Sequence, residues 1–355
     1  MNILITLAWT STRAELGFRM TTIYDIAKAT GFSAPTISKA LNGTGHLLEE
    51  TRKLILEKAQ EMGYEPNSAA RSLATKRTYL IGIIYDDPSM QRGFRHPLFA
   101  RILNKFKESV ENSGYDIIFL SCHTKLSYRA HAAFRSVEGI VIINGESVLH
   151  SELEELGKIG IPCVSTNGVI PGICTIIGDN VASGYKAAQY LVSKGHRKIG
   201  FLSAPGDDFI MSAQERYEGF CKYMRENGIS VDPTYFEKCD SWRVESGKKG
   251  FEALYKRHPD MTAVFAVSDL FALGVMEYAE QNGIKIPEQL SIIGFDDDLI
   301  ANYTSPRLTT FRQDADGIAT LAADLLLEHI VGLPVPEKLI RLPTQFIERD
   351  SVISI

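Results

Sequence analysis

Polar side chains that can hold a small hydrophilic molecule stand at the ends of several apolar segments in this chain. Asn167, Asp269, Asp296 and Asp297 each close a run that reads as a buried strand. Amide and carboxylate groups exchange hydrogen bonds with the hydroxyl groups of a ligand. In open α/β folds ligands bind beyond the carboxyl ends of the strands, so these residues predict a binding site there.

The sequence motifs of the common catalytic and phosphate-binding sites are missing. There is no GxGxxG after a strand, no GxxxxGK, no GxSxG and no HExxH. The five cysteines are odd in number and too widely spaced for a CxxC or Cys/His metal pattern: Cys122, Cys163, Cys174, Cys221 and Cys239. We therefore expect binding rather than catalysis, no metal, no cofactor, and thiols buried in a reducing cytosol.

The segments that must position these side chains begin after Thr78, where apolar strands alternate with amphipathic helices. We expect strands at 79–85, 115–121, 139–144, 161–166, 198–204, 263–269 and 290–297. Helices fall between them, for example at 98–113, 181–194, 213–227, 245–257 and 270–282. Continuous apolar strands separated by helices predict parallel sheets covered on both faces. About ten strands are too many for one ordinary sheet, so we expect two doubly wound lobes with a cleft between them.

Residues 22–42 predict two short helices joined by a tight turn. Apolar side chains face inward from both: Ile23, Ile26 and Ala27 from the first, and Ile37, Ala40 and Leu41 from the second. Gly31 ends the first helix. Ser33 stands at the N-cap of the second helix and Pro35 in its first turn, where a missing N–H costs nothing.

A unit of two short helices needs a third to complete its core, and residues 49–62 supply one. Leu54, Ile55, Ala59 and Met62 are predicted to share its apolar face. The three helices form a helix-turn-helix pattern, whose second helix can enter a DNA major groove. A three-helix cap without a DNA role is the alternative interpretation.

The charge distribution agrees with DNA contact at one end of the chain. The whole chain has a net charge of −5, whereas residues 20–77 carry +2 and residues 78–355 carry −8. No apolar run approaches the ~20 residues of a membrane span, and the start lacks the features of a signal peptide. Met20 precedes the first helix directly, so we expect residues 1–19 to be a non-native or disordered extension, with a functional N-terminal arm as the alternative.

Six stretches in the chain occur in the order typical of one known family. They are TIYDIAKATGFSAPTISKALNG at 22–43, ETRKLILEKAQEMGYEPNSAARSLATKRTYLIGII at 50–84, GHRKI at 195–199, RYEGF at 216–220, SIIGFDD at 291–297 and LTT at 308–310. From about Thr21 to the C-terminus the sequence thereby resembles the lactose-repressor (LacI/GalR) family of bacterial transcription regulators.

The resemblance implies an all-α helix-turn-helix head plus a hinge helix, joined to an α/β two-lobed core like that of periplasmic binding proteins, with two doubly wound parallel sheets. The domains are then 20–66 for the DNA-binding head, 67–77 for the hinge helix and linker, and 78–355 for effector binding and dimerisation. It implies a homodimer on a pseudo-palindromic operator in double-stranded DNA, controlled by a small molecule, and no membrane partner.

The resemblance also assigns residues to DNA contact. Ala34, Pro35 and Lys39 match the base-reading positions, but only Lys39 can donate hydrogen bonds to guanine. Small polar side chains suit phosphates, or serve as plain caps and surface groups: Thr22, Ser33, Thr36, Ser38 and Asn42. In the hinge, Leu73 matches the wedge that enters the minor groove and Arg71 a phosphate contact. Two alternatives stay open: Leu73 is a linker residue packed on the core, and Arg71 is an exposed linker arginine.

In the core, Arg216 matches the arginine that clamps the effector, with a surface ion pair as the alternative. Asp296 matches the carboxylate that accepts sugar hydroxyls, or else caps a helix, a role for which Asp297 is the stronger candidate. Trp242 matches an aromatic platform or belongs to the core. Further cleft candidates are Phe99, Asn167, Ser268, Asp269 and Gln313. His96 replaces the usual Asn of the segment that precedes Phe99.

The sequence thus predicts a ligand-responsive regulator, a repressor of carbohydrate-utilisation genes with a sugar-like effector. Nucleobases and phosphorylated sugars stay open as effectors. Three other interpretations are a regulator controlled by a protein coregulator, a sugar-binding receptor of the periplasmic type, and an enzyme with a DNA-binding head. The start of the chain does not read as a signal peptide, which argues against the periplasmic receptor. The sequence shows no catalytic constellation, which argues against the enzyme.

The Leu73 hypothesis leads to a direct test on DNA. Leu73→Ala removes the wedge, so it should weaken binding to a specific operator far more than binding to an unrelated duplex, because only specific binding needs the kink. Titration of both duplexes at one salt concentration measures this. Equal losses on the two duplexes contradict the wedge role.

Overall fold

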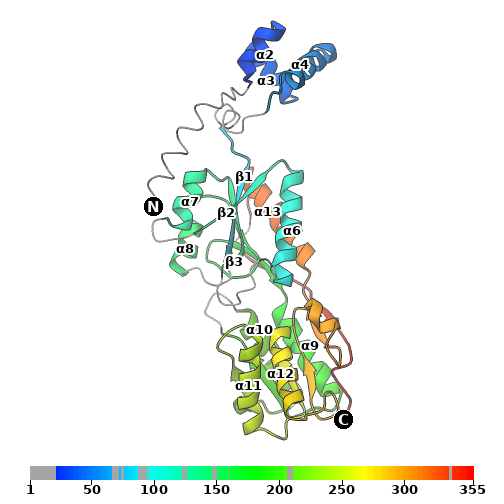
Figure 1. Cartoon of the computed structure of the whole chain (residues 1–355). Helices are drawn as coiled ribbons and strands as arrows, with labels where there is room; N and C mark the ends of the chain where they lie inside the picture. Colours follow the sequence, from blue (N-terminus) through cyan, green and yellow to red (C-terminus); the bar gives the residue numbers. More distant parts are fainter. Residues whose placement is uncertain are drawn as a thin grey trace, which may run out of the picture. The chain divides into compact units, whose positions relative to one another are not determined.

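The chain forms two compact units, Met1–Arg77 and Thr78–Ile355. The structure is a computed structural model and describes residues 21–65, 72, 76–86, 94, 96–121, 126–145, 150–158, 160–205, 211–335 and 338–355. The predicted extension at 1–19, Cys122, and Arg71 and Leu73 of the predicted hinge lie outside the described residues. The two units are described separately below (Figure 1).

Within residues 21–65 the first unit contains three helices, α2 (Ile23–Thr30), α3 (Ala34–Leu41) and α4 (Glu49–Glu61). Thr22 caps α2 by accepting a bond from the Asp25 amide, and the Asp25 carboxylate accepts one from the Thr22 amide at 2.9 Å. Gly31 ends α2 in the left-handed conformation at φ 75°, which glycine adopts without steric cost. The predicted end of α2 at Gly31 is therefore confirmed.

Five buried side chains hold the three helices together: Ile26, Ile37, Ala40, Ile55 and Ala59. Met62 packs against this cluster as predicted, whereas the prediction for Leu54 is wrong, because its side chain is 49% exposed. Successive residues of an α-helix are about 100° apart, so a stripe centred on Ile55 and Ala59 turns Leu54 to its edge.

The second unit begins with a parallel six-stranded sheet of order β11-β5-β4-β3-β1-β2. Its strands are β1 (Leu80–Asp86), β2 (Asp116–Leu120), β3 (Gly139–Gly145), β4 (Cys163–Ser165), β5 (Cys174–Gly178) and β11 (Leu339–Leu342). Helices α6 (Pro97–Asn112) and α13 (Ala315–Ile330) cover one face, and α7 (Tyr128–Arg135) and α8 (His150–Lys158) the other. We call this part the N-lobe.

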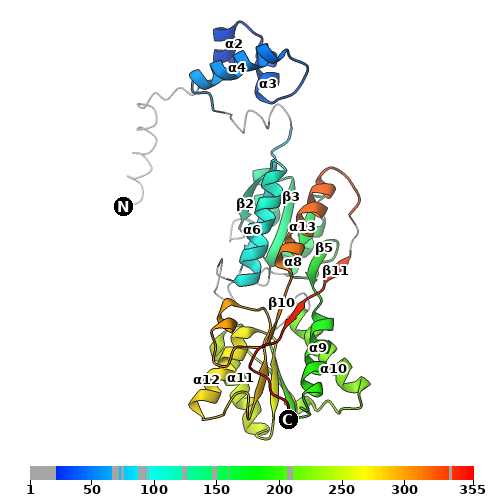
Figure 2. The same cartoon turned by 90° about the vertical axis from the view of Figure 1, so that its right-hand side faces the viewer.

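The C-lobe contains a parallel four-stranded sheet of order β7-β6-β8-β9. Its strands are β6 (Ile199–Ser203), β7 (Phe236–Lys238), β8 (Ala263–Ala266) and β9 (Ser291–Ile293). Its helices are α9 (Asn180–Ser193), α10 (Ser212–Glu226), α11 (Val244–Arg257) and α12 (Asp269–Gln281), with the short turns η2 (Pro233–Tyr235) and η3 (Leu299–Asn302). Figure 2 shows α9 and α10 on one side of this sheet and α11 and α12 on the other.

Three segments connect the lobes, after β5, after β10 (Thr310–Arg312) and after β11. The last leads into β12 (Gln345–Ile347), which pairs antiparallel with β10. A Cβ on Gly178 would lie 2.6 Å from Gln313 Oε1 and 3.3 Å from Thr344 Cγ2. The three connections therefore lie side by side and form one hinge region, in which a side chain on Gly178 would displace the end of the Gln313 side chain.

The predicted class of two parallel sheets is confirmed, whereas several element bounds differ. Most of the predicted strands end one to three residues earlier or later, and β5, β7, β10, β11 and β12 were not predicted. These five strands have three to five residues each, too few for a clear apolar pattern. Four predicted buried thiols are buried and free: Cys163, Cys174, Cys221 and Cys239.

Two glycines let α9 and α10 pack with their backbones in contact. A Cβ on Gly184 would lie 1.8 Å from the Arg216 carbonyl oxygen, and one on Gly219 1.9 Å from the Val181 carbonyl oxygen. Distances this short cannot be relieved by a side-chain rotation, because both obstacles are backbone atoms. The closeness of the two helices fixes where the second turn of α10 lies.

Gly184→Ala should therefore destabilise the second unit by about 1–3 kcal/mol, the usual cost of overpacking a core. Urea unfolding of the full chain measures this. Lys186→Ala, on the exposed face of the same helix, is the matched control and should change stability by less than about 0.5 kcal/mol. Equal unfolding midpoints for the two variants contradict the packing argument.

Candidate functional site

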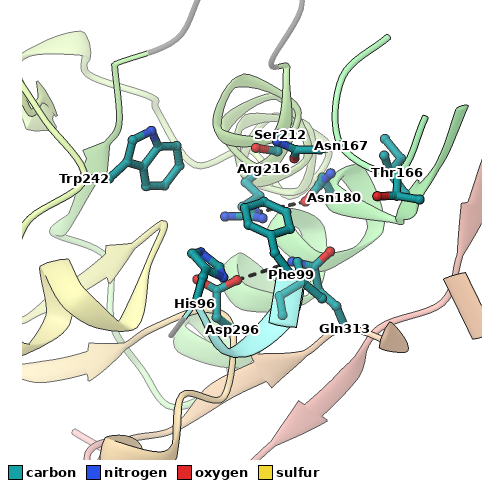
Figure 3. A pocket seen from close by; sticks show the side chains of 12 residues that line it. His96, Phe99, Thr166, Asn167, Asn180, Ser212, Arg216, Trp242, Asp296 and Gln313 are labelled. Atoms are coloured by element: carbon teal, nitrogen blue, oxygen red, sulfur yellow. Dashed lines mark hydrogen bonds between the residues drawn. The ribbon is translucent and has the colours of Figure 1, made fainter. Parts of the chain in front are cut away.

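A hollow of about 530 Å³, partly open to solvent, lies between the two lobes. Twelve residues line it: His96, Leu98, Phe99, Thr166, Asn167, Ile177, Asn180, Ser212, Arg216, Trp242, Asp296 and Gln313. The structure thus brings together six of the eight predicted cleft residues from distant parts of the sequence (Figure 3).

Arg216 is the central cation of this pocket. It lies in the second turn of α10, is buried, and donates from Nε to Asn180 Oδ1 at 2.9 Å and from Nη1 to the Val267 carbonyl oxygen at 2.5 Å. Its guanidinium carbon lies 3.4 Å from the centre of the Phe295 ring, a cation–π contact. The alternative of a surface ion pair is therefore excluded.

Burial lowers the pKa of the Arg216 guanidinium to about 10, while the nearby carboxylates of Asp296, Glu215 and Asp269 act in the opposite direction. The group stays cationic at neutral pH. A guanidinium in a pocket wall can hold two hydroxyls or one carboxylate of a ligand.

Asp296 lines the same pocket as Arg216, and its charge acts to raise the pKa of the guanidinium. Its Oδ1 accepts a bond from Gln313 Nε2 at 3.3 Å and its Oδ2 one from Ser268 Oγ at 3.4 Å. Its backbone φ of 112° is a conformation that side-chain-bearing residues rarely adopt. Surrounding contacts hold this carboxylate at the pocket wall, so the alternative that Asp296 caps a helix does not apply.

The expectation that Asp297 caps a helix is wrong, because Asp298 does so at the N-terminus of η3. Asp297 is instead nearly buried and pairs with Arg349 at 2.6 Å and with Arg312 at 2.6 Å. Its backbone φ of 51° lies in the left-handed region, which residues other than glycine adopt uncommonly.

Ser268 and Asp269 do not line the hollow but support its wall. Ser268 caps α12 and donates to Asp296. Asp269 accepts a bond from Thr310 Oγ1 at 2.6 Å and one from the Asp298 amide at 2.7 Å. Burial, together with the charge of Asp296, raises the pKa of Asp269 well above its usual range.

Aromatic rings line the pocket from both lobes. Trp242, in the C-lobe, is buried and stacks on Phe271 with ring centres 5.7 Å apart. It is therefore both a core residue and a pocket residue. In the N-lobe, His96 stacks on Phe99 with ring centres 4.2 Å apart, just before and within the first turn of α6.

The amide and hydroxyl groups of the pocket come from both lobes. Asn167 follows β4 and donates from Nδ2 to Asn144 Oδ1 at 3.0 Å. Five lining residues were not singled out from the sequence: Leu98, Thr166, Ile177, Asn180 and Ser212. Ile177 and Asn180 belong to β5 and the start of α9, so the unpredicted β5 is the reason that they were missed.

The pocket has the chemistry of a binding site. It offers a cation, a carboxylate, amides and aromatic surface, which suits a hydroxyl-rich ligand with an apolar face. Within the residues that the structure describes, no group of three or more His, Cys, Asp or Glu side chains could hold a metal ion. None of the described helices is long and apolar enough to cross a membrane.

In the first unit, α3 presents a polar outer face. Pro35, Lys39 and Asn42 are exposed and follow one another at i, i+4 and i+7, so they lie on one side of the helix. Ala34, Thr36 and Ser38 are half-buried beside them. The Lys39 stem lies against Gly45, where an added Cβ would be 3.1 Å from Lys39 Cδ.

The caps predicted at both ends of α3 are present. Ser33 Oγ accepts a bond from the Thr36 amide at 3.3 Å, and Asn42 Nδ2 donates to the Ser38 carbonyl oxygen at 2.9 Å. Tyr24, which the sequence analysis did not single out, is 72% exposed in the first turn of α2, near Thr22. The sequence shows the aromatic residue next to Thr22, whereas only the structure shows that its ring is exposed.

A helix-turn-helix head and a two-lobed α/β core with a polar cleft define the class of ligand-binding transcription regulators. Residues 22–67 match the family described as "Bacterial regulatory proteins, lacI family", and residues 188–352 match a "Periplasmic binding protein-like domain". The HTH-type transcriptional repressor PurR of Serratia proteamaculans (strain 568) is 31% identical over 340 residues, which cover 94% of this chain and 97% of that protein.

Two solved structures match nearly the whole chain. A transcriptional regulator CelR–cellobiose complex is 25% identical with a TM-score of 0.68, covering 93% of this chain and 99% of that one. The lac repressor dimer bound to operator and the anti-inducer ONPF is 22% identical with a TM-score of 0.79, covering 94% and 100%. The chain belongs to the LacI family of bacterial transcription regulators, which are DNA-binding proteins and not enzymes.

Arg216→Ala should leave operator binding intact and abolish the response to effector, because the cation lies in the pocket of the second unit and not in the head. Operator binding titrated with and without saturating effector measures both properties. An effector response that survives the substitution means that the role of Arg216 in the cleft is assigned wrongly.

Proposed function

We propose that this protein is a repressor of carbohydrate-utilisation genes that binds a pseudo-palindromic operator as a homodimer and responds to a sugar or sugar derivative in the interlobe pocket. The observation that carries the proposal is a pocket with aromatic walls that is lined by the opposite charges of Arg216 and Asp296, within a chain that also has a helix-turn-helix head. Such a chain can convert ligand binding into a change in DNA affinity.

The head would contact DNA through α3 and the ends of its helices. Lys39 would donate to a guanine edge, while Ala34 and Pro35 would make apolar contacts with thymine methyl groups. Thr22, Ser33, Thr36, Ser38 and Asn42 would bind phosphates, and the exposed Tyr24 is a further candidate. Arg71 and Leu73 keep their proposed roles in a hinge at 67–77, on phosphate and in the minor groove.

The effector would be held by opposite charges in one pocket. Arg216 supplies donors, Asp296 accepts hydroxyl hydrogens, and Trp242 and Phe99 cover apolar ring faces. Asn167 and Gln313 would add amide contacts, whereas Ser268 and Asp269 would act behind Asp296. Cellobiose in the similar CelR complex supports a sugar as the ligand class.

Dimerisation of the core at 78–355 has support from an exposed apolar cluster on and beside η3. Leu299 is 68%, Ile300 41% and Tyr303 74% exposed, within a span of five residues. Large apolar side chains gathered on one surface mark interaction sites. A symmetric dimer would cover this cluster and present two heads to two operator half-sites. Because operator DNA lies in the bacterial cytoplasm, we place the protein there.

Effector binding would act on DNA through the hinge. A ligand shifts the equilibrium between two states only by its differential affinity for them. Typical coupling free energies of about 1–3 kcal/mol correspond to roughly 5–150-fold changes in DNA affinity, which is sufficient for a transcriptional switch. The two domains would be joined at 67–77, with residues 20–66 as the DNA-binding domain.

A ligand screen on the full chain tests the proposal. The chain is first used to select its operator from random duplexes, and its unfolding temperature is then measured with sugars, sugar phosphates and nucleobases. A ligand at 100 times its dissociation constant should stabilise the core by about 2.7 kcal/mol. The same ligand should change operator affinity at least about fivefold.

The outcomes of this screen separate the proposal from its rivals. Selection of a pseudo-palindrome and a shift with a sugar support the proposal. No shift with any of the three classes contradicts the sugar effector and favours a protein coregulator. Failure to select any DNA sequence contradicts the regulator itself.

A further inference from the structure

A buried acidic side chain lies directly behind the central cation of the pocket. Glu215 precedes Arg216 on α10 and is only 2% exposed. Its Oε1 pairs with Arg341 Nη2, and its Oε2 accepts a bond from Asn180 Nδ2 at 3.4 Å. Neither Glu215 nor Arg341 lines the hollow, so neither belongs to the pocket described above.

The ion pair joins the two lobes. Arg341 belongs to β11, the edge strand of the N-lobe sheet, and pairs in register with Ile177 of β5. Glu215 belongs to α10 of the C-lobe. Figure 2 shows β11 at the edge of its sheet next to the lobe that carries α9 and α10. The contact is therefore a direct charged link from one lobe to the other, close to the hinge.

Asn180 connects this ion pair to Arg216 in the pocket. Its Nδ2 donates to Glu215, while its Oδ1 accepts the bond from Arg216 Nε at 2.9 Å. The amide cannot satisfy both neighbours in the reverse orientation, since a guanidinium only donates and a carboxylate only accepts. The relay thus runs from Arg341 through Glu215 and Asn180 to Arg216, and it fixes the plane of the Arg216 guanidinium.

The buried Glu215 carboxylate lies between two cations, Arg341 at one end of the relay and Arg216 at the other, and both compensate its charge. A buried carboxylate without a counter-charge is costly, so removal of Arg341 leaves Glu215 uncompensated except through Asn180 and the neighbouring Arg216. In that state Glu215 competes with the ligand and with Asp296 for the Arg216 cation. The Arg216 guanidinium can then adopt more than one orientation toward the pocket.

We propose that the Glu215–Arg341 ion pair is an interlobe brace that positions Arg216 for ligand recognition. Both members are positioning residues, since neither lines the pocket. The brace holds the start of α10 against β11, and Asn180 transmits its geometry to the guanidinium. The naming of Arg216 as a ligand contact rests on the proposed function, whereas the brace itself concerns only the packing of the two lobes.

The brace can be tested without knowing the ligand. The chain has two tryptophans, Trp9 and Trp242, and Trp242 lines the pocket. In the full chain carrying Trp9→Phe, fluorescence quenching by acrylamide then reports access to Trp242 alone. Arg341→Met should raise the quenching constant about twofold or more, because the uncompensated carboxylate loosens the contact between the lobes.

Three further variants make the test specific. Arg341→Lys keeps the charge and should stay near the parent, a rescue that loss of arginine packing alone would not give. Arg101→Met breaks the exposed Arg101–Asp316 pair within the N-lobe and should change nothing. Glu215→Gln keeps the side-chain shape without the charge and should raise quenching, which gives a second measurement if Arg341→Met does not fold.

Each outcome decides the proposal. Higher quenching in Arg341→Met and Glu215→Gln, with parent values in Arg341→Lys and Arg101→Met, supports the brace. Quenching in both Arg341→Met and Glu215→Gln that equals the Arg101→Met value overturns it. Since the readout needs neither effector nor operator, failure of the brace is distinguishable from failure of the proposed repressor function, which the DNA selection tests separately.

Discussion

The burial of the Arg216 guanidinium in the C-lobe wall of the pocket is the constraint on which the rest of the core depends. A cation removed from water requires nearby acceptors and negative charge, here the Asn180 amide, the Val267 carbonyl, the Phe295 ring and the carboxylates of Asp296 and Glu215. These groups come from strands and helices of the C-lobe, and the Arg341 partner of Glu215 comes from the N-lobe. All of these groups lie at or just behind the pocket wall. The geometry of the pocket therefore depends on how the two lobes pack against each other.

Local backbone choices serve the same site. Asp296 and Asp297 both have positive φ, a strain of the order of 1–3 kcal/mol for each residue that surrounding contacts must offset. Arg312 and Arg349 hold Asp297, while Gln313 and Ser268 hold Asp296. The glycine contacts between α9 and α10 add a further constraint, because they set the depth at which Arg216 lies. A site arranged in this way is pre-organised, which reduces the ordering cost of ligand binding.

The two units of the chain differ in how they are stabilised. The head closes on five buried apolar side chains and relies on caps at its helix ends, whereas the core has extended apolar clusters on both faces of its sheets. A small core limits the stability of the head, and its polar face is correspondingly open to a partner. The core carries the acidic charge and the ligand site, whereas the head carries a small positive charge. The two units therefore differ in net charge as they differ in what they bind.

The sequence by itself determined the helix-turn-helix head, because capping residues, a turn glycine and a 3.6-residue apolar period are local signals. It also determined the alternation of strands and helices and, through family motifs, the candidates Arg216, Asp296 and Trp242. Only the tertiary structure decided that Ser268 and Asp269 lie behind the pocket wall, that Asp297 joins an arginine pair rather than a helix cap, and that Leu54 is exposed. It alone placed Glu215 against Arg341, two residues more than a hundred positions apart. Such contacts depend on how two lobes meet across a hinge, and no local pattern encodes that distance.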